Sequence, residues 1–334
     1  MNFSRTSKRI ASAAAALGVV IALAACSGTA ATPAGSTGAA PKHANITIGT
    51  GGQLSNADIL LAQSEGFFKK AGLTAKVQIL TAGSNAIPQL LNGSMTFATV
   101  DLATAITATA QNIGITAVAP NTVGSPGVKG YAGIIAGKAS GVTDLAGLAG
   151  KTVAVNQLGG TAETLTKASL KKAGVDPASV KFVEVAPPSF LSTLAKGTVD
   201  AIVAGEPLTS IAVATGATLL ANPEQTTVPD VPTFVFIASK AYVTANPGIV
   251  REFQKAILEG NTFANANPDK VRSTQKTGPT LSPQILAVAT LPTFGEKALT
   301  ASQIQAYLDV LTTYGGLDAT KAPKASAVLA SLNQ

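Results

Sequence analysis

Short apolar runs alternate with amphipathic segments along most of the chain after residue 44. The apolar runs are rich in β-branched residues, as strands are, while the segments between them carry apolar residues at helical spacing. Strands that alternate with helices indicate βαβ units, so the pattern predicts an α/β fold with mainly parallel sheets. The first predicted elements, in order, are strand 46–51, helix 56–72, strand 75–80, helix 86–93, strand 96–100, helix 102–114 and strand 115–120.

The pattern recurs about one hundred residues later. FFKKAGL at 67–73 matches SLKKAGV at 169–175, and KVQIL at 76–80 matches KFVEV at 181–185. Farther along, IPQLLNGSMTFATVD (87–101) lies opposite FLSTLAKGTVDAIVAGE (190–206), with an acidic residue ending both segments. The recurrence predicts two similar α/β lobes in one chain.

Two strand-like segments, 130–137 and 231–239, flank the second copy. If both cross between lobes, lobe 1 comprises residues 44–132 plus 236–334 and lobe 2 comprises residues 133–235. The globular part has about 290 residues, which is more than a single hydrophobic core usually stabilises, and this length also favours two lobes. Two crossing segments would form a hinge.

The first 25 residues have the pattern of a secretory signal, a basic start followed by a short apolar run. The run ends in LAAC, which resembles the lipobox of bacterial lipoproteins, and Cys26 is the chain's only cysteine. We therefore expect residues 1–25 to be a lipoprotein signal peptide and Cys26 to be lipidated. Residues 26–43 are mostly Gly, Ala, Ser, Thr and Pro and predict a flexible tether.

The formal charge of +7 falls to +4 when the three basic residues of the leader are removed. That charge, without a basic run that contains aromatic residues, argues against a nucleic-acid partner. After residue 44, no stretch approaches the 18 consecutive apolar residues that a membrane-spanning helix needs. The lipid on Cys26 is thus the expected membrane attachment.

Four segments resemble the solute-binding proteins of ABC importers, in the branch that serves nitrate, sulfonates, taurine and thiamine-pyrimidine precursors. They are LLAQSEGFFKKAGL, LLNGSMTFATVD, DLAGLAGKTVAVNQLGGTAE and LAKGTVDAIVAGEPLTSIA, and the resemblance covers roughly residues 45 to 240. It implies the type II periplasmic-binding-protein fold, a small-molecule ligand, and an ABC permease with its ATPase as partners. The chain departs from members that carry a large aromatic residue before the Glu-Pro pair, because Gly205 stands there.

In parallel α/β sheets, ligands bind beyond the carboxyl ends of strands, where helix starts present free N–H groups. Five loops of this chain have that place in the predicted fold. Either helix capping or ligand contact would explain the polar side chains there, and Thr161 is expected to cap its helix while facing the ligand. The candidate ligand-binding residues are Gln53, Ser55, Asn56, Gly83, Ser84, Asn85, Asp101, Asn156, Gln157, Thr161, Ala162 and Glu206.

Asp101 and Glu206 occupy matching places in the two copies. Each would either cap the next helix or bind a cationic group of the ligand. Two carboxylates would repel a bare inorganic anion, so the pair favours a ligand that contains an amine.

The sequence gives little evidence that the protein is an enzyme. The chain's only histidine, His43, lies in the predicted tether, so Ser84 has no base to activate it and no Ser-His-Asp triad or usual zinc site can form. SLKK (169–172) and KTG (276–278) match two motifs of penicillin-binding enzymes, but no Ser-x-Asn lies between them. We therefore expect no catalytic residue, metal or cofactor.

The sequence thus predicts a lipid-anchored, extracytoplasmic substrate-binding protein that acts as a monomer. Two alternatives stay open, an enzyme like those of thiamine-pyrimidine synthesis and a sensory binding lipoprotein without a transporter.

Overall fold

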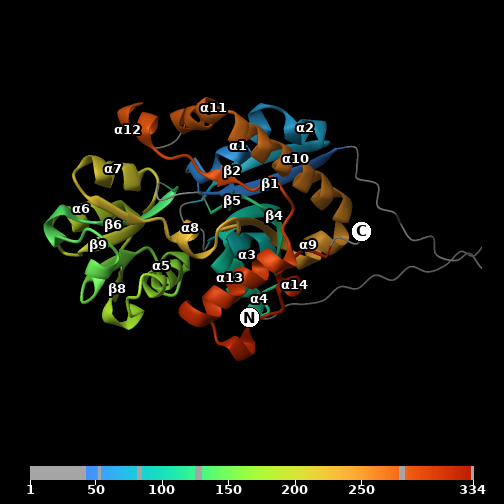
Figure 1. The fold of residues 1–334 in the computed structure, drawn as a ribbon. Helices are drawn as coiled ribbons and strands as arrows, with labels where there is room; N and C mark the ends of the chain where they lie inside the picture. Colours follow the sequence, from blue (N-terminus) through green and yellow to red (C-terminus); the bar gives the residue numbers. More distant parts are fainter. Residues whose placement is uncertain (1–42, 52–53, 81–84, 125–129, 278–282, 332–334) are drawn as a thin grey trace, which may run out of the picture. The chain divides into compact units, whose positions relative to one another are not determined.

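The computed structural model describes residues 43–51, 54–80, 85–124, 130–277 and 283–331. The predicted leader, Cys26 and most of the predicted tether lie outside these ranges, as do the candidate site residues Gln53, Gly83 and Ser84. Within the described residues, the strands form two five-stranded sheets and one two-stranded sheet (Figure 1). The two-stranded sheet pairs β5 (Thr122–Val123) with β12 (Thr293–Phe294).

The first sheet has the order β2-β1-β3-β11-β4. Four of its strands run in one direction, and β11 is antiparallel to both of its neighbours. The residues of β4 are all buried, as expected for a strand that is covered on both faces. The strands are β1 (Ala44–Thr50), β2 (Leu73–Ile79), β3 (Phe97–Asp101), β4 (Ile115–Pro120) and β11 (Phe234–Ser239).

The second sheet repeats this order as β8-β7-β9-β6-β10, with β6 as its antiparallel strand. The registers also agree. Ala44 pairs with Leu73 in the first sheet and Thr152 with Lys181 in the second, a spacing of 29 residues in both. The sequence repeat therefore corresponds to a repeat of topology. The strands are β6 (Ala132–Ala136), β7 (Thr152–Val155), β8 (Lys181–Glu184), β9 (Ala201–Gly205) and β10 (Thr218–Ala221).

Helices pack on both faces of the first sheet. One face is covered by α1 and α10, and the other by α3, α4, α13 and α14 (Figure 1). The helices from the two chain segments that build this region are α1 (Ala57–Ser64), α2 (Phe67–Lys70), α3 (Ala86–Leu91), α4 (Leu102–Ala110), α9 (Lys240–Ala245), α10 (Pro247–Ala266), α11 (Pro268–Ser273), α12 (Pro283–Val288), α13 (Ala301–Tyr314) and α14 (Ala325–Val328).

The second sheet also has an apolar cluster on each face, one under α5 and the other under α6 and α7. Its helices are α5 (Thr161–Lys172), α6 (Phe190–Ala195), α7 (Leu208–Ala214) and α8 (Pro223–Thr227). Short 3₁₀ turns connect many of the elements in both regions. They are η1 (Leu54–Asn56), η3 (Lys138–Ser140), η4 (Ala146–Leu148), η5 (Pro177–Ser179), η6 (Pro187–Ser189), η7 (Thr274–Thr277) and η8 (Ala319–Lys321).

The prediction of a single helix over residues 56–72 is wrong. The chain instead forms α1 and α2, which are separated at Gly66, a residue with a φ of 80°. A left-handed residue cannot continue an α-helix, and glycine adopts that conformation without steric cost. The apolar spacing hides the break because Phe68 of α2 still faces the same buried cluster as Ile59 of α1.

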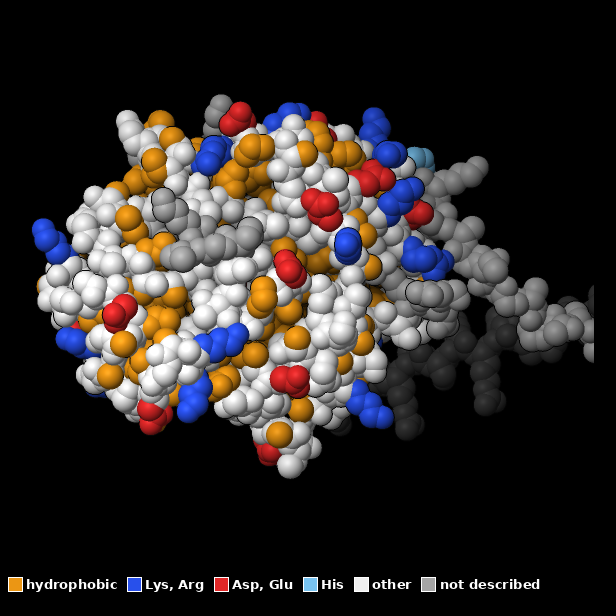
Figure 2. Space-filling view, in the orientation of Figure 1, with side chains coloured by type: hydrophobic (Ala, Val, Ile, Leu, Met, Phe, Trp, Pro, Cys, Tyr) orange, Lys and Arg blue, Asp and Glu red, His pale blue; other side chains and the backbone are white. Residues whose placement is uncertain are grey.

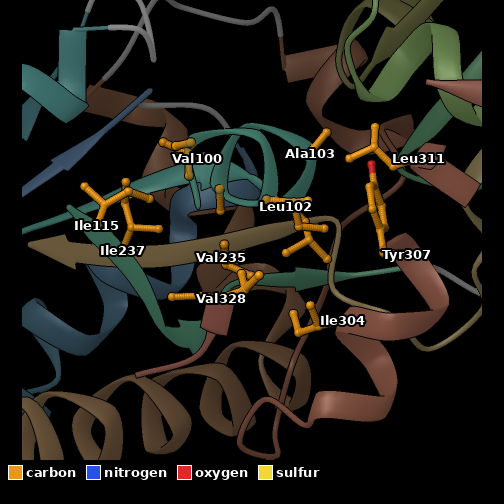
Figure 3. Packing of buried hydrophobic residues seen from close by; sticks show 14 of the residues in the cluster. Val100, Leu102, Ala103, Ile115, Val235, Ile237, Ile304, Tyr307, Leu311 and Val328 are labelled. Carbon is orange, nitrogen blue, oxygen red and sulfur yellow. The ribbon is translucent and has the colours of Figure 1, made fainter. Parts of the chain in front are cut away.

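One apolar cluster extends from the first sheet to a helix of the second sheet. It contains Tyr307, Leu308 and Leu311 of α13 together with Leu165 of α5. Figure 3 shows Tyr307 at the edge of this cluster, beside Leu311. Helix α13 thus brings the N-terminal half of α5 against the core of the first sheet.

Candidate functional site

Asp101 is the last residue of β3 and also the N-cap of α4. The main-chain N–H of Thr104 donates to its Oδ1 at 3.0 Å, and the Thr104 hydroxyl donates to its Oδ2 at 2.6 Å. The carboxylate thereby satisfies a free N–H group of the first helical turn, where negative charge also interacts favourably with the helix dipole. Of the two roles predicted for Asp101, the structure shows helix capping.

Asp101 also accepts a hydrogen bond from a helix that packs on the second sheet. The hydroxyl of Thr161, the first residue of α5, donates to Asp101 Oδ1 at 2.8 Å. This bond joins the carboxyl end of β3 to the helix start that follows β7. The loops at Asp101 and Thr161, which the sequence analysis assigned to one ligand site, are therefore in direct contact.

Thr161 does not cap its own helix, contrary to expectation. The N-cap of α5 is Gly160, and no side-chain capping bond is present there. Thr161 Oγ1 instead accepts a hydrogen bond from the Tyr307 hydroxyl at 2.9 Å while donating to Asp101. Since a hydroxyl has one proton to donate, Thr161 is fully committed as a donor.

Tyr307 was not among the predicted site residues. Its side chain is fully buried, and burial together with the nearby charge of Asp101 raises the pKa of its hydroxyl far above the usual value. It therefore stays protonated and acts as a donor to Thr161. Tyr307 lies at apolar helical spacing with Ile304 and Leu311, so the sequence offered no signal that separated it from an ordinary core residue.

Glu206 lies just after β9 and is only 3% exposed. Ser210, in the first turn of α7, donates its N–H to Glu206 Oε2 at 3.1 Å and its hydroxyl to Oε1 at 2.8 Å. The N–H of Thr290, after α12, donates to Oε1 at 3.0 Å. Burial raises the pKa of Glu206, and these donors oppose the rise. Glu206 thus binds a helix start and also a segment far along the chain.

Tyr131 connects Glu206 to two other predicted residues. Its buried hydroxyl donates to the main-chain oxygen of Glu206 at 3.3 Å. Burial raises the pKa of Tyr131 to about 12, and hydrogen bonding with Ser55 offsets part of that rise. Ser55 in turn accepts a bond from Asn56 Nδ2 at 3.3 Å. The buried Asn56 side chain makes no capping bond to α1, although Asn56 is its N-cap residue.

The remaining predicted residues that the structure describes lie nearer the surface. Asn85 is exposed and is the N-cap of α3 without a side-chain capping bond. Asn156 and Gln157 are exposed in the loop after β7, and Ala162 packs partly against the core of the second sheet. Their side chains are therefore not brought into the contacts around Asp101 or Glu206.

A groove of about 610 Å³ lies beside the Asp101–Thr161 contact. One wall carries the polar residues Thr104 and Thr107 of α4 and its C-cap residue Gln111. The opposite walls are the 157–160 loop and the 315–318 turn. Among the candidate residues, Gln157 lines this groove. The space is large enough for a small organic molecule.

The described residues contain no group of three or more His, Cys, Asp or Glu side chains that could hold a metal ion. Within the same part of the chain, no helix is both long and apolar enough to cross a membrane. On the face seen in Figure 2, the described Lys and Arg side chains are dispersed among Asp and Glu and form no continuous basic patch.

Residues 53–271 match the model of the NMT1/THI5-like protein family. No match was found among curated proteins at the level of sequence.

Solved structures of similar fold include the MOPS-bound alkanesulfonate-binding protein SsuA from Xanthomonas axonopodis pv. citri, with 22% identity and a TM-score of 0.68 over 86% of this chain and 98% of that chain. The sulphonate-binding SsuA of Escherichia coli has 19% identity and a TM-score of 0.68 over 85% and 95% of the two chains. The nitrate-binding protein NrtA from Synechocystis PCC 6803 has 16% identity and a TM-score of 0.66, with 86% of both chains covered. These likenesses agree with the α/β fold predicted from the sequence.

Proposed function

Because the chain belongs to the NMT1/THI5-like family, we propose that it is the substrate-binding protein of an ABC importer. Its ligand would be a small organic molecule of the sulfonate, taurine or pyrimidine type, held between two lobes. The observation that carries this proposal is the hydrogen bond between Asp101 and Thr161, which joins strand-end loops of the two sheets. Ligands of α/β sheets bind at such strand ends.

The proposed mechanism is closure about a hinge. Lobe 1 would comprise residues 44–132 and 236–334, and lobe 2 residues 133–235, so that the chain crosses between them twice. A ligand that contacts both lobes binds the closed form more tightly, and this difference in affinity is what shifts the equilibrium. An ABC permease, with its ATPase, would then recognise the closed form.

The proposed location is the outer face of the cell membrane. A diacylglyceryl group on Cys26 would supply two or more acyl chains, which hold a protein far more firmly than one chain does. The tether that ends near His43 would let the monomeric binding protein reach its permease.

Two measurements on the purified protein test the proposal together. A thermal-shift panel of sulfonates, taurine, nitrate and aminopyrimidines should identify a stabilising compound, since a ligand that binds only the folded state raises its stability. Small-angle scattering with that compound should then show compaction. Stabilisation without compaction would contradict hinge closure, and consumption of the compound would favour the enzymatic alternative.

A further inference from the structure

Thr290 connects the first sheet region to Glu206, which follows a strand of the second sheet. It lies between α12 and β12, and β12 pairs with β5, the strand just after β4 of the first sheet. The N–H of Thr290 donates to Glu206 Oε1 at 3.0 Å, and the Thr290 side chain also hydrogen-bonds to this carboxylate. Helix α12, just before Thr290, lies against α7 of the second sheet region (Figure 1). Glu206 is thus bound by a segment that belongs to the other sheet.

The Asp101 contact is the counterpart of this one, with the two regions exchanged. Asp101 ends β3 and Glu206 follows β9, and β3 and β9 are the middle strands of their sheets. Asp101, in the first region, accepts the hydroxyl of Thr161, the first residue of α5 in the second region. The internal repeat has therefore produced two reciprocal contacts, each between a carboxylate of one region and a threonine of the other.

A buried tyrosine supports each contact. The Tyr307 hydroxyl donates to Thr161 at 2.9 Å. Tyr131 and Glu206 are joined twice, because the Tyr131 hydroxyl donates to the Glu206 main-chain oxygen at 3.3 Å and the Glu206 N–H donates to the Tyr131 main-chain oxygen at 2.9 Å. The Tyr131 ring lies in one apolar cluster with Phe294 of β12. Because hydrogen bonds to a carboxylate are stronger than neutral ones and strengthen further where water is excluded, both contacts should stabilise the arrangement of the two regions measurably.

Either contact can break without leaving its carboxylate unpaired. Asp101 keeps the N–H and hydroxyl of Thr104 at its own helix start, and Glu206 keeps the N–H and hydroxyl of Ser210. A carboxylate that lost all its donors on separation of the regions would make that step far more costly. The bonds from Thr161 and Thr290, in contrast, form only while the two regions are together. They therefore stabilise that state alone and bias an equilibrium between an open and a closed form.

We propose that the Asp101–Thr161 and Glu206–Thr290 contacts are two reciprocal latches, which keep part of the ligand-free protein closed. This inference rests on the proposed function and adds the way in which its hinge closure is regulated. Asp101 and Glu206 are then positioning residues for closure, and a ligand closes the fraction of molecules that the latches leave open.

The first test removes the Asp101–Thr161 latch and measures the radius of gyration by small-angle scattering without ligand. Thr161→Val deletes the hydroxyl that donates to Asp101 from the second region. Thr104→Val is the matched control, because it deletes a hydroxyl that donates to the same carboxylate, at 2.6 Å, from within the first region. Thr161→Val should raise the open-to-closed ratio about tenfold and enlarge the radius, whereas Thr104→Val should keep the wild-type radius.

The second test applies the same measurement to the Glu206–Thr290 latch. Thr290→Pro removes both the N–H and the hydroxyl that bind Glu206. The control Ser210→Ala removes a hydroxyl bond of 2.8 Å to the same Oε1 atom, from within the second region. Thr290→Pro should enlarge the ligand-free radius about as much as Thr161→Val does, and the double variant should enlarge it further. If circular dichroism shows that Thr290→Pro is unfolded, Glu206→Ala takes its place.

A latch variant with the same ligand-free radius as its control would overturn the inference. Scattering with taurine, ethanesulfonate, nitrate and an aminopyrimidine as probes separates that result from failure of the proposed function. Compaction of the wild type by a probe, with equal ligand-free radii in variants and controls, would leave the proposed function standing without the latches. Enlarged radii in the latch variants, with compaction by no probe, would support the latches and count against the proposed function. A probe that returns the latch variants to the compact radius would show that they opened about the hinge and did not merely lose packing.

Discussion

The hydroxyl of Thr161 lies 2.8 Å from the carboxylate of Asp101, although these residues follow strands of different sheets. Tyr307 completes the contact by donating to the same hydroxyl. Three separate chain segments therefore meet at one threonine. This arrangement makes Thr161 the most direct place to measure how strongly the two sheet regions are coupled.

Replacing Thr161 by valine should lower the free energy of unfolding by about 1–3 kcal/mol, since it leaves buried Tyr307 without an acceptor. A double-mutant cycle of Thr161→Val with Tyr307→Phe, followed by urea denaturation, should give a coupling energy of about 0.5–3 kcal/mol. Thr166→Val is the matched control, because the Thr166 hydroxyl bonds Ala162 within α5. Additive effects of Thr161→Val and Tyr307→Phe would contradict the coupling.

Gly315 packs closely against α5. A Cβ at this position would lie 2.6 Å from Thr164 Oγ1 and 2.4 Å from Leu311 Cδ1, while the φ of −94° suits any residue. Gly315→Ala should therefore separate α13 from α5 and cost about 1–3 kcal/mol in a thermal or urea unfolding experiment. Gly114→Ala, whose Cβ would have no neighbour closer than 3.8 Å, should change stability by much less.

Asp58 is fully buried and gives the protein a predictable pH dependence. Burial raises its pKa from 3.8 to about 7, and a hydrogen bond from Asn121 offsets part of the rise. The folded protein therefore holds this proton more tightly than the unfolded chain does. The free energy of unfolding should fall as pH rises from about 4 to about 7, by roughly 4 kcal/mol at most, and then level off.

The variant Asp58→Asn should remove this contribution, so that its stability relative to wild type increases between pH 5 and pH 8. Glu224, whose pKa burial also raises to about 7, should leave a residual slope of the same sign. Urea titrations at several pH values would measure both effects. The exposed Asp269→Asn serves as control, and a wild-type stability that rises over this range would refute the assignment.

The proposed lipid anchoring would depend on one atom, the Cys26 sulfur. Expression of the full chain with Cys26→Ser should move the protein from the membrane fraction to the soluble extracytoplasmic fraction, because no acyl chain can be attached. Ser27→Ala, which retains the thiol, is the neighbouring control. Membrane retention of the Cys26→Ser protein would show that attachment does not require the thiol.

Much of the fold could be read from the residues. Alternating apolar runs located β1 to β4 within about two residues, because a buried parallel strand needs a continuous apolar run. The internal repeat predicted two similar α/β lobes, and the structure contains two five-stranded sheets with the same strand order. The local pattern also placed Asp101 and Glu206 at strand ends, just before a helix. A carboxylate there accepts hydrogen bonds from the first turn of the next helix, and this contact depends only on the local sequence.

Only the tertiary structure decided which side chains meet. Thr161 is hydrogen-bonded to Asp101, 60 residues away in the sequence, and to Tyr307, 146 residues away. The periodicities that predict helices and strands carry no information about contacts between residues so far apart. Tyr307 has the apolar spacing of a core residue because its ring packs in the core. Only the packing of α13 against α5 directs its hydroxyl to Thr161. A sequence thus determines elements through local burial and capping, whereas hydrogen-bond partners depend on how distant elements pack.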